Sequence, residues 1–355
     1  MTPHWWARYW QAVVASVRRH PRAYAGTGGA VAGVAAGITA IILMMTSAPA
    51  PARPGGPATT PAAATGPLTS PFTGEPVTSR GPVLALKIDN IVRARPQTGL
   101  KAADIVYVLP VEGGLSRFLA VYSSQLPPVI GPVRSAREDD LEVLRQFGTP
   151  AFAYSGATPH LLPFVHRARI VDLYAGLPKS AGAYFRDNSR AAPYNFYARP
   201  AQLVAGAAGA STARDIGFRF GPAPASALGK TAASFAAGYS AAAFTFTWSA
   251  AQKRWLVAMD ANPASDTSGG QLGAPTIVIQ YTTVRTSRFL EYGAPPPYAQ
   301  SVGHGTAVVL RDGKAYTVTW SRPNGNVGTT YTTATGERMT FAKGQVWVLL
   351  TAPPR

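Results

Sequence analysis

Apolar residues cluster along residues 82–123 in short runs that predict three β-strands. The strand segments are VLALKID (83–89), IVYVLPV (105–111) and LSRFLAVYS (115–123). Glu112-Gly113-Gly114 separates the last two runs, and its glycines allow the tight reversal of a hairpin loop. We therefore expect a sheet in this part of the chain.

A helical pattern follows over EDDLEVLRQF (138–147). Ser135 is placed to cap this helix, Glu138 stands three residues later as in a capping box, and Gly148 can end the run. A second short helix is predicted to begin at Thr158-Pro159, where a capping residue precedes a proline. Helices thus accompany the first sheet.

The second half of the chain has the alternation of β-structure. Residues 201–237 are rich in Ala and Gly and predict a helix followed by a loose connector. Asp312-Gly313 gives a hairpin turn within the β-rich part. The predicted strands are AAFTFTWS (242–249), RWLVAMD (254–260), TIVIQYTTV (276–284), TAVVLR (306–311), AYTVTWS (315–321), RMTF (338–341) and VWVLLTA (346–352). This pattern predicts a mainly antiparallel second domain.

The amino-terminal region contains one apolar segment without charges, from Ala23 to Ala52. Three arginines precede it closely and only Arg53 follows it, so the positive-inside rule predicts a membrane-spanning helix with a cytoplasmic amino terminus. A cleaved signal peptide ending at Ala48-Pro49-Ala50 is the alternative, but Pro51 disfavours cleavage. We expect a single-pass protein of the cell membrane with its body outside the cytoplasm.

The fold class expected from these patterns is α+β, with an amino-terminal mixed sheet with helices and a carboxy-terminal mainly antiparallel β domain, preceded by one transmembrane helix. The expected organisation is a basic cytoplasmic segment (1–27), the transmembrane helix (28–47), a Pro/Ala/Thr-rich stalk (48–70), an amino-terminal domain (71–225) and a carboxy-terminal domain (238–355).

Charge and composition narrow the range of partners and of chemistry. The formal net charge is +17, and removing the four arginines before residue 23 from the 33 basic residues leaves 29 against 16 acidic ones. Such a body attracts anionic partners, although arginine enrichment can also reflect a GC-rich genome. The chain has no cysteine, its five histidines lack ligand spacing, and it shows no phosphate-loop, serine-hydrolase or zinc-protease motif. We expect no metal and no cofactor.

Several spaced motifs follow one another along the chain. They are PFTG (71–74), KIDN (87–90), ARPQTGL (94–100), ADIVY (103–107), VEGGLSRFLAVY (111–122), IGPVRSAR (130–137), RDNSRAAPYNFY (186–197) and VGHGTAVVLRDGK (302–314). In this order the motifs resemble the YerB-like lipoprotein family. The resemblance implies an amino-terminal and a carboxy-terminal domain of unknown function outside the cytoplasm. This chain departs from it by having no lipid-carrying cysteine and by having Tyr194 where the family usually has a histidine.

The strongest local signal for ligand binding is the segment Gly131–Arg137, which leads into the predicted helix. Arg134, Ser135 and Arg137 at a helix amino terminus predict a site for a phosphate or a carboxylate. In the alternative interpretation, these arginines pair with Glu138, Asp139 or Asp140 and only fix the helix.

Other candidate ligand-binding residues lie in loops at strand ends, a common place for functional groups. They are Asp89, Asn90, Arg95, Glu112, Arg117, Arg186, Asp187, Arg190 and Asn195. Glu112 is a candidate general acid or base, or else the ion-pair partner of an arginine across the sheet. We expect these loops to line one cleft.

Two functions remain open at this point. The favoured one is a binding or scaffolding module whose arginine-rich cleft holds an anionic cell-wall polymer or a partner protein of the envelope. The alternative is a carboxylate-based hydrolase of cell-wall glycans that uses two of Asp89, Asp104, Glu112 and Asp187. Nucleic acid is not an expected partner, because the body is outside the cytoplasm and shows no basic recognition helix.

Overall fold

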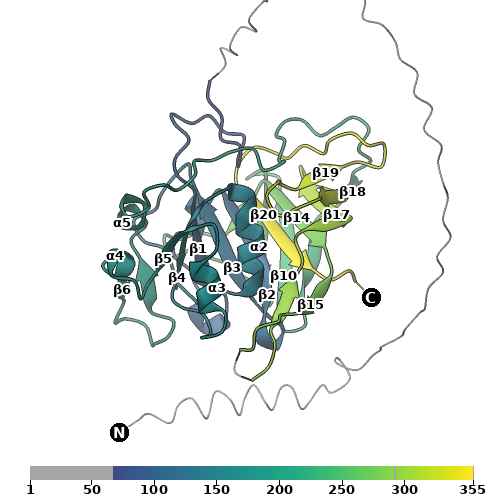
Figure 1. Ribbon diagram of the computed structural model, residues 1–355. Helices are drawn as coiled ribbons and strands as arrows, with labels where there is room; N and C mark the ends of the chain where they lie inside the picture. The colour runs from purple at the N-terminus through teal and green to yellow at the C-terminus, as the bar shows by residue number, and fades with distance from the viewer. Residues whose placement is uncertain (1–66, 292, 355) are drawn as a thin grey trace, which may run out of the picture. The chain divides into compact units, whose positions relative to one another are not determined.

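Among the described residues, the apolar runs of β1, β2, β3, β14 and β20 form the middle of one large mixed sheet (Figure 1). The computed structural model describes residues 67–291 and 293–354. The strand order is β19-β18-β17-β14-β20-β2-β3-β1-β4-β5, and β8 pairs with β18 beside this path. The strands of this sheet are β1 (Leu84–Asp89), β2 (Ile105–Val111), β3 (Leu115–Tyr122), β4 (Ala151–Tyr154), β5 (Val171–Tyr174), β8 (Lys230–Thr231), β14 (Thr276–Tyr281), β17 (Gly303–Arg311), β18 (Lys314–Arg322), β19 (Thr330–Thr332) and β20 (Val346–Thr351).

Smaller elements surround the large sheet. A second sheet contains β9 (Ser234–Tyr239), β10 (Ala242–Ser249), β11 (Arg254–Met259), β12 (Asn262–Pro263) and β13 (Gly273–Ala274). Two hairpins pair β6 (Tyr184–Arg186) with β7 (Phe196–Ala198) and β15 (Val284–Thr286) with β16 (Pro297–Ala299). The helices are α2 (Glu138–Leu144), α3 (Leu162–His166), α4 (Pro178–Ala181) and α5 (Pro200–Ala205), with 3-10 turns η2 (Val92–Ala94), η3 (Leu100–Ala102), η4 (Glu112–Gly114) and η5 (Arg145–Phe147). The fold is therefore α+β and mostly sheet.

The last strand of the chain, β20, joins the two halves of the large sheet. It is parallel to β14 on one side and to β2 on the other, with Val346 facing Thr276 and Ile105 in the two registers. All six of its residues are buried, as expected for a parallel strand covered on both faces. The expectation of a mainly antiparallel second domain is therefore corrected at β20, which pairs in parallel with a strand of each half.

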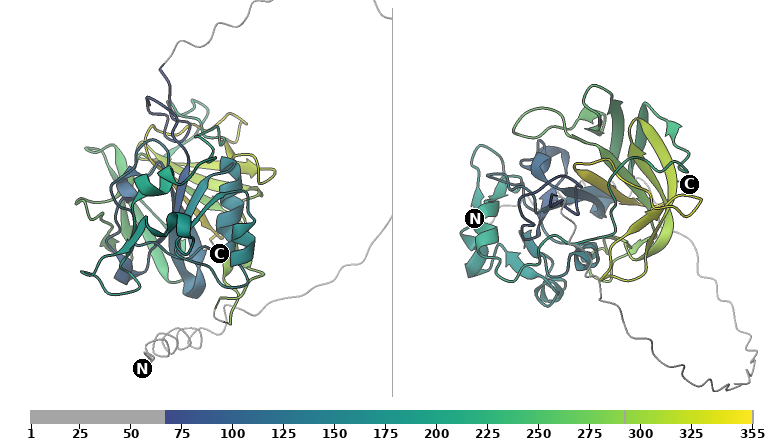
Figure 2. Two further views of the ribbon diagram at one scale, coloured as in Figure 1. Left: turned by 60° about the vertical axis from the view of Figure 1, so that its left-hand side comes forward. Right: turned by 90° about the horizontal axis from the view of Figure 1, so that it is seen from above.

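Two apolar cores lie on opposite faces of the large sheet and draw residues from both halves of the chain. On one face, Phe118 packs edge-on against Trp347 and against Phe244 of the second sheet, at 5.5 Å and 6.4 Å between ring centroids. On the other face, Leu144 and Phe147 of the α2 region are buried. Figure 1 shows α2 in front of the large sheet, and Figure 2 shows from the side that α2 lies across the sheet from the green strands of the second sheet.

Most predicted strands are confirmed, and the exceptions have local causes. The run RMTF (338–341) forms only isolated bridges, because Met339 and Phe341 point into the core beside Tyr331 and the 218–220 segment. The connector after α5 is also less loose than predicted, since Ala213, Ile216 and Phe218 are buried in the second core. The Asp312-Gly313 turn is confirmed, with positive φ at both residues.

The predicted cytoplasmic segment, the transmembrane helix and the stalk up to residue 66 lie outside the described residues. Among the residues that the structure describes, no helix is both long and apolar enough to span a membrane. The predicted boundary between the domains 71–225 and 238–355 stays a prediction; in space, both segments contribute strands to the same sheet.

Candidate functional site

Three predicted site residues meet where parallel strands β1 and β2 end. Asp89 is the last residue of β1, Glu112 follows β2, and Arg117 stands directly opposite Asp89 on the intervening strand β3. The carboxyl ends of parallel strands in open sheets are a frequent place for ligands, because the following loops diverge there. This edge is the core of the candidate site.

The segment 130–137 brings two more arginines to this edge. It runs beside β1, where the Arg134 amide donates to the Lys87 carbonyl at 2.8 Å. On its other side, the Ser155 amide donates to the Arg134 carbonyl at 3.0 Å, so the segment lies between β1 and the end of β4. These backbone bonds hold Arg134 and Arg137 beside Asp89 and Glu112.

Both of these arginines pair with carboxylates. Arg134 Nε lies 2.9 Å from Asp89 Oδ2, and the side chain of Arg134 is 22% exposed. Arg137 is 2% exposed and makes two bonds to Glu112, from Nε to Oε1 at 2.6 Å and from Nη2 to Oε2 at 3.1 Å. Its Nη1 lies 2.9 Å from Glu291 Oε1. Arg137 is therefore a buried structural residue that pairs with two carboxylates, whereas the side chain of Arg134 is partly exposed to solvent.

Arg117 differs from its two neighbours because it lacks a carboxylate partner in the described part of the chain. Its Nη1 donates to the Ser135 carbonyl at 3.1 Å, and its buried Nε has no hydrogen-bond acceptor. The residue is 8% exposed. A buried guanidinium with unused donors is costly, and an anionic ligand is the group that would satisfy it.

The predicted role of Ser135 as a helix cap is wrong. The residue before α2 is Arg137, and the Asp140 carboxylate accepts from the Arg137 amide at 2.7 Å. The first turn of the helix already carries Glu138, Asp139 and Asp140, and their negative charges occupy the place that an anion would take. The alternative partners were also wrong, since Arg134 and Arg137 pair with Asp89, Glu112 and Glu291 instead.

Burial and the arginines set the protonation of this cluster. Burial disfavours the charged form of Glu112, but the guanidiniums of Arg137 and Arg117 outweigh it and lower its pKa to about 2. Burial, assisted by the nearby Arg137, lowers the pKa of Arg117 to about 10. Burial also raises the pKa of Glu291, which Arg137 opposes. Glu112 and the guanidiniums are thus charged at neutral pH.

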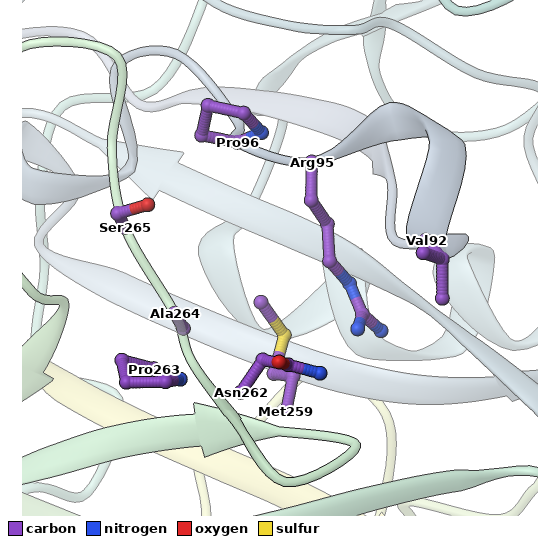
Figure 3. Close-up of a pocket in the computed structure, with 8 residues that line it drawn as sticks. All are labelled: Val92, Arg95, Pro96, Met259, Asn262, Pro263, Ala264 and Ser265. Atoms are coloured by element: carbon purple, nitrogen blue, oxygen red, sulfur yellow. The ribbon is translucent and has the colours of Figure 1, made fainter.

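Asn90 and Arg95 form the next layer, away from the arginine cluster. Asn90 donates to Ser116 Oγ at 2.9 Å, and its carbonyl accepts from Arg95 Nη2 at 2.9 Å. Arg95 also pairs with Asp260 at 2.7 Å. Figure 3 shows Arg95 extending from the 92–96 segment towards Met259 and Asn262, across a pocket of about 220 Å³. All three of its guanidinium nitrogens donate hydrogen bonds, so Arg95 stabilises the conformation of this loop.

The third predicted cluster, on the β6–β7 hairpin, is separate from the arginine site. Arg186 donates to Asn195 Oδ1 at 2.8 Å across the hairpin, and exposed Asp187 caps its turn by accepting from the Ser189 amide. Arg190 alone reaches the neighbouring loop, where it donates to the Arg95 carbonyl at 3.0 Å. The structure thus brings the first group of predicted residues together and leaves Arg186, Asp187 and Asn195 as hairpin residues.

Sequence reasoning missed several charged residues of the site region. Lys87 and Asp140 are fully buried and pair at 2.6 Å, next to Asp139, both of whose carboxylate oxygens lack hydrogen bonds. The lysine within the apolar run VLALKID was a signal for such a pair, because a buried charge needs a partner. Glu291 lies in the loop between β15 and β16 and had no local pattern that could reveal its role.

Comparison with known proteins agrees with the predicted resemblance. Residues 68–213 match the amino-terminal domain, and residues 235–348 the carboxy-terminal domain, of a family described as a protein of unknown function (DUF3048). The chain is 37% identical over 131 residues to a Bacillus subtilis (strain 168) protein named "Putative lipoprotein YerB"; the alignment covers 37% of this chain and 39% of the relative.

A solved structure shows the same fold. The crystal structure of YerB protein from Bacillus subtilis superimposes with a TM-score of 0.66 at 20% sequence identity, over 79% of this chain and 96% of that one. Both family domains are present in the expected order, and apart from residue 292 both lie within the described residues. The chain therefore belongs to the YerB-like family that joins the two DUF3048 domains.

Proposed function

We propose that this protein is a membrane-anchored binding protein of the bacterial cell envelope, whose body lies outside the cytoplasm and binds an anionic cell-wall polymer. The binding site is the cluster of Arg117 and Arg134 at the carboxyl ends of β1 and β2. Arg137 and Glu112 form the rigid wall beside it.

The main support for this proposal is that the buried guanidinium of Arg117 lacks a carboxylate partner among the described residues. The Nε of this side chain also has no acceptor. A phosphate or carboxylate accepts several N–H bonds from a guanidinium in one plane, which is the geometry that arginine offers. Arg134 lies at the more open side, 22% exposed, and provides a second contact for the same anion.

The proposed location draws on two independent supports. The uncharged segment from Ala23 to Ala52, with arginines before it, fits an anchor that leaves the body outside. The Bacillus relative is named as a lipoprotein, a class attached to membranes from the outer side. The excess of basic residues in the body suits the phosphate-rich polymers of that compartment.

The geometry supports binding better than glycan hydrolysis. Asp104 and Glu112 flank β2 at its opposite ends, about 26 Å apart at the rise of a strand, too far for a carboxylate pair. Asp89 and Glu112 share an edge, but each is engaged by an arginine, Arg134 and Arg137 respectively. A carboxylate held in this way is a poor proton donor or nucleophile.

The proposal is tested by retention of the full-length protein, purified in detergent, on a resin that carries poly(glycerol phosphate). Replacing Arg117 and Arg134 together by Gln should weaken binding at least tenfold, because each charge-assisted contact contributes about 1.5 to 3 kcal/mol. The matched control is Arg80→Gln with Lys343→Gln, which removes two exposed charges that make no ion pair among the described residues.

The two double variants separate a site from a general charge effect. We expect the control to bind within about threefold of the wild type, and added salt to release both proteins by screening. Equal loss in the two variants would contradict the site and show that binding follows net charge alone. No retention of the wild type, with capture of a protein from the envelope instead, would replace the polymer by a partner protein.

A further inference from the structure

Among the residues that the structure describes, Glu291 is the one acidic residue of the carboxy-terminal half that reaches the arginine cluster. It lies in the loop between β15 and β16 and is 5% exposed. Its Oε1 lies 2.9 Å from Arg137 Nη1 but lacks hydrogen-bond geometry. The guanidiniums of Arg117 and Arg134 also act on it electrostatically. A carboxylate therefore already lies among the three arginines.

The charge balance shows that Glu291 is surplus to the structure. Arg137 donates two hydrogen bonds to Glu112, and Arg134 is paired with Asp89. With Glu291 present, three guanidiniums meet three carboxylates and the cluster is neutral. Without it, the cluster has one positive charge in excess, next to the unused Nε donor of Arg117. Glu291 thus neutralises the positive charge that an anionic ligand would otherwise neutralise.

The loop that carries Glu291 is held at its base by contacts to α2 and α3. At the base, Ser287 Oγ donates to Glu138 at 2.6 Å, Arg288 pairs with the same carboxylate at 2.7 Å, and Phe289 packs on Phe164. At the tip, backbone bonds between Glu291 and Ala294 close the turn on itself.

We infer that Glu291 is an internal competitor for the anion site, and that its carboxylate must leave the arginine cluster before an external phosphate or carboxylate binds to Arg117 and Arg134. The inference rests on the proposed function and adds the regulation of the same site. It requires that the apparent affinity of the wild type equal the intrinsic affinity multiplied by the fraction of molecules in which Glu291 has left the site.

The test measures the affinity of the full-length protein for a synthetic glycerol phosphate oligomer, whose phosphodiesters stay charged at the pH values used. Glu291→Gln keeps the shape of the side chain and removes its charge. We expect its affinity to rise about tenfold, which corresponds to about 1.4 kcal/mol. The matched control Glu75→Gln removes the same charge from an exposed residue near the opposite end of the strands, where the Thr73 carbonyl accepts from the Gly344 amide. It should leave the affinity unchanged.

Adding Arg117→Gln to Glu291→Gln should abolish the gain, since the gained contact is to Arg117. An affinity of Glu291→Gln equal to that of the wild type, while wild-type binding still depends on Arg117 and Arg134, would overturn the inference and leave the proposed function intact. An absence of binding by both proteins would overturn the proposed function. An equal gain in the Glu75 control would also overturn the inference, because net charge would then explain it.

A second measurement uses the unaltered protein and needs no substitution to fold. The charged groups that face Glu291 are Glu112 on η4, Arg117 on β3, and Arg134 and Arg137 of the 130–137 segment. The arginines stay charged, and the pKa of Glu112, about 2, lies far below the range used. Because burial raises the pKa of Glu291, lowering the pH into the range in which this carboxyl takes up a proton should strengthen binding to the wild type. A wild-type affinity that falls as the pH is lowered through that range would contradict the competition.

Discussion

Two neighbouring buried carboxylates, Asp139 and Asp140, should respond in opposite ways to the same substitution. Asp140 pairs with Lys87 at 2.6 Å, whereas neither oxygen of Asp139 has a hydrogen-bond partner. Burial, only partly offset by Lys87, raises the pKa of Asp139 from 3.8 to about 7. The folded protein therefore favours a protonated Asp139.

The size and sign of the effect follow from this pKa difference. Below pH about 4 the group is protonated in both the folded and the unfolded chain, so it costs nothing. Above pH about 7 it is ionised in both, and the folded state bears the cost of a buried charge, which for a shift of about 3 pKa units is about 4 kcal/mol. The free energy of unfolding should thus fall as the pH rises from about 4 to about 7.

Asp139→Asn removes this charge while keeping the shape of the side chain. We expect the variant to be more stable than the wild type at pH 8, by up to about 4 kcal/mol, and similar to it at pH 4. Urea unfolding followed by tryptophan fluorescence at several pH values measures both differences. In the control, Asp140→Asn should lower the stability by about 3 to 5 kcal/mol, because it leaves Lys87 buried without a partner.

An Asp139→Asn variant that is less stable than the wild type at pH 8 would refute the prediction that ionised Asp139 destabilises the fold. The same conclusion would follow if its free energy of unfolding kept the pH dependence of the wild type. Either result would show that Asp139 is ionised and well solvated by its surroundings in the folded protein.

Three further predictions follow from the same contacts. Arg137→Gln should destabilise the fold by about 3 to 5 kcal/mol in urea unfolding, because it leaves Glu112 and Glu291 without their ion-pair partner. Arg134→Gln removes a partly exposed partner and should cost about 1 kcal/mol or less. The folded protein lowers the pKa of Glu112 because it stabilises the charged carboxylate. The contribution of Glu112 to the free energy of unfolding should therefore be complete above pH about 4.5 and lost as the pH falls towards 2, and acid titration of Glu112→Gln should lack that transition. Limited proteolysis should spare residues 211–220, which contribute to a core, and early cleavage there would contradict their burial.

Much of the local structure was predictable because it depends on neighbouring residues. The limits of β2, β3 and β10 follow their apolar runs, and Glu112–Gly114 forms the expected reversal between β2 and β3. The helix after Arg137 was predicted, but its cap was not, since the choice of Arg137 over Ser135 depends on contacts that residues distant in sequence make. Local pattern alone could not rank these alternatives.

The pairing of segments far apart in the sequence was not predictable from pattern alone. The six-residue apolar run of β20 indicated a strand buried on both faces, but not that its partners are β14 and β2. The partners of Arg137 show the same limit, because Glu112 lies 25 positions before it and Glu291 more than 150 after it. Their proximity is a property of the assembled sheet.

The central place of β20 sets the order in which this chain can fold as it emerges from synthesis or export. Until residues 346–351 arrive, β2 and β14 each present a bare edge with unpaired amides and carbonyls, and such edges invite pairing with other chains. The amino-terminal half must therefore wait, incomplete, until residues 346–351 have been synthesised. A truncation just before residue 346 would leave two half-sheets without the strand that joins them.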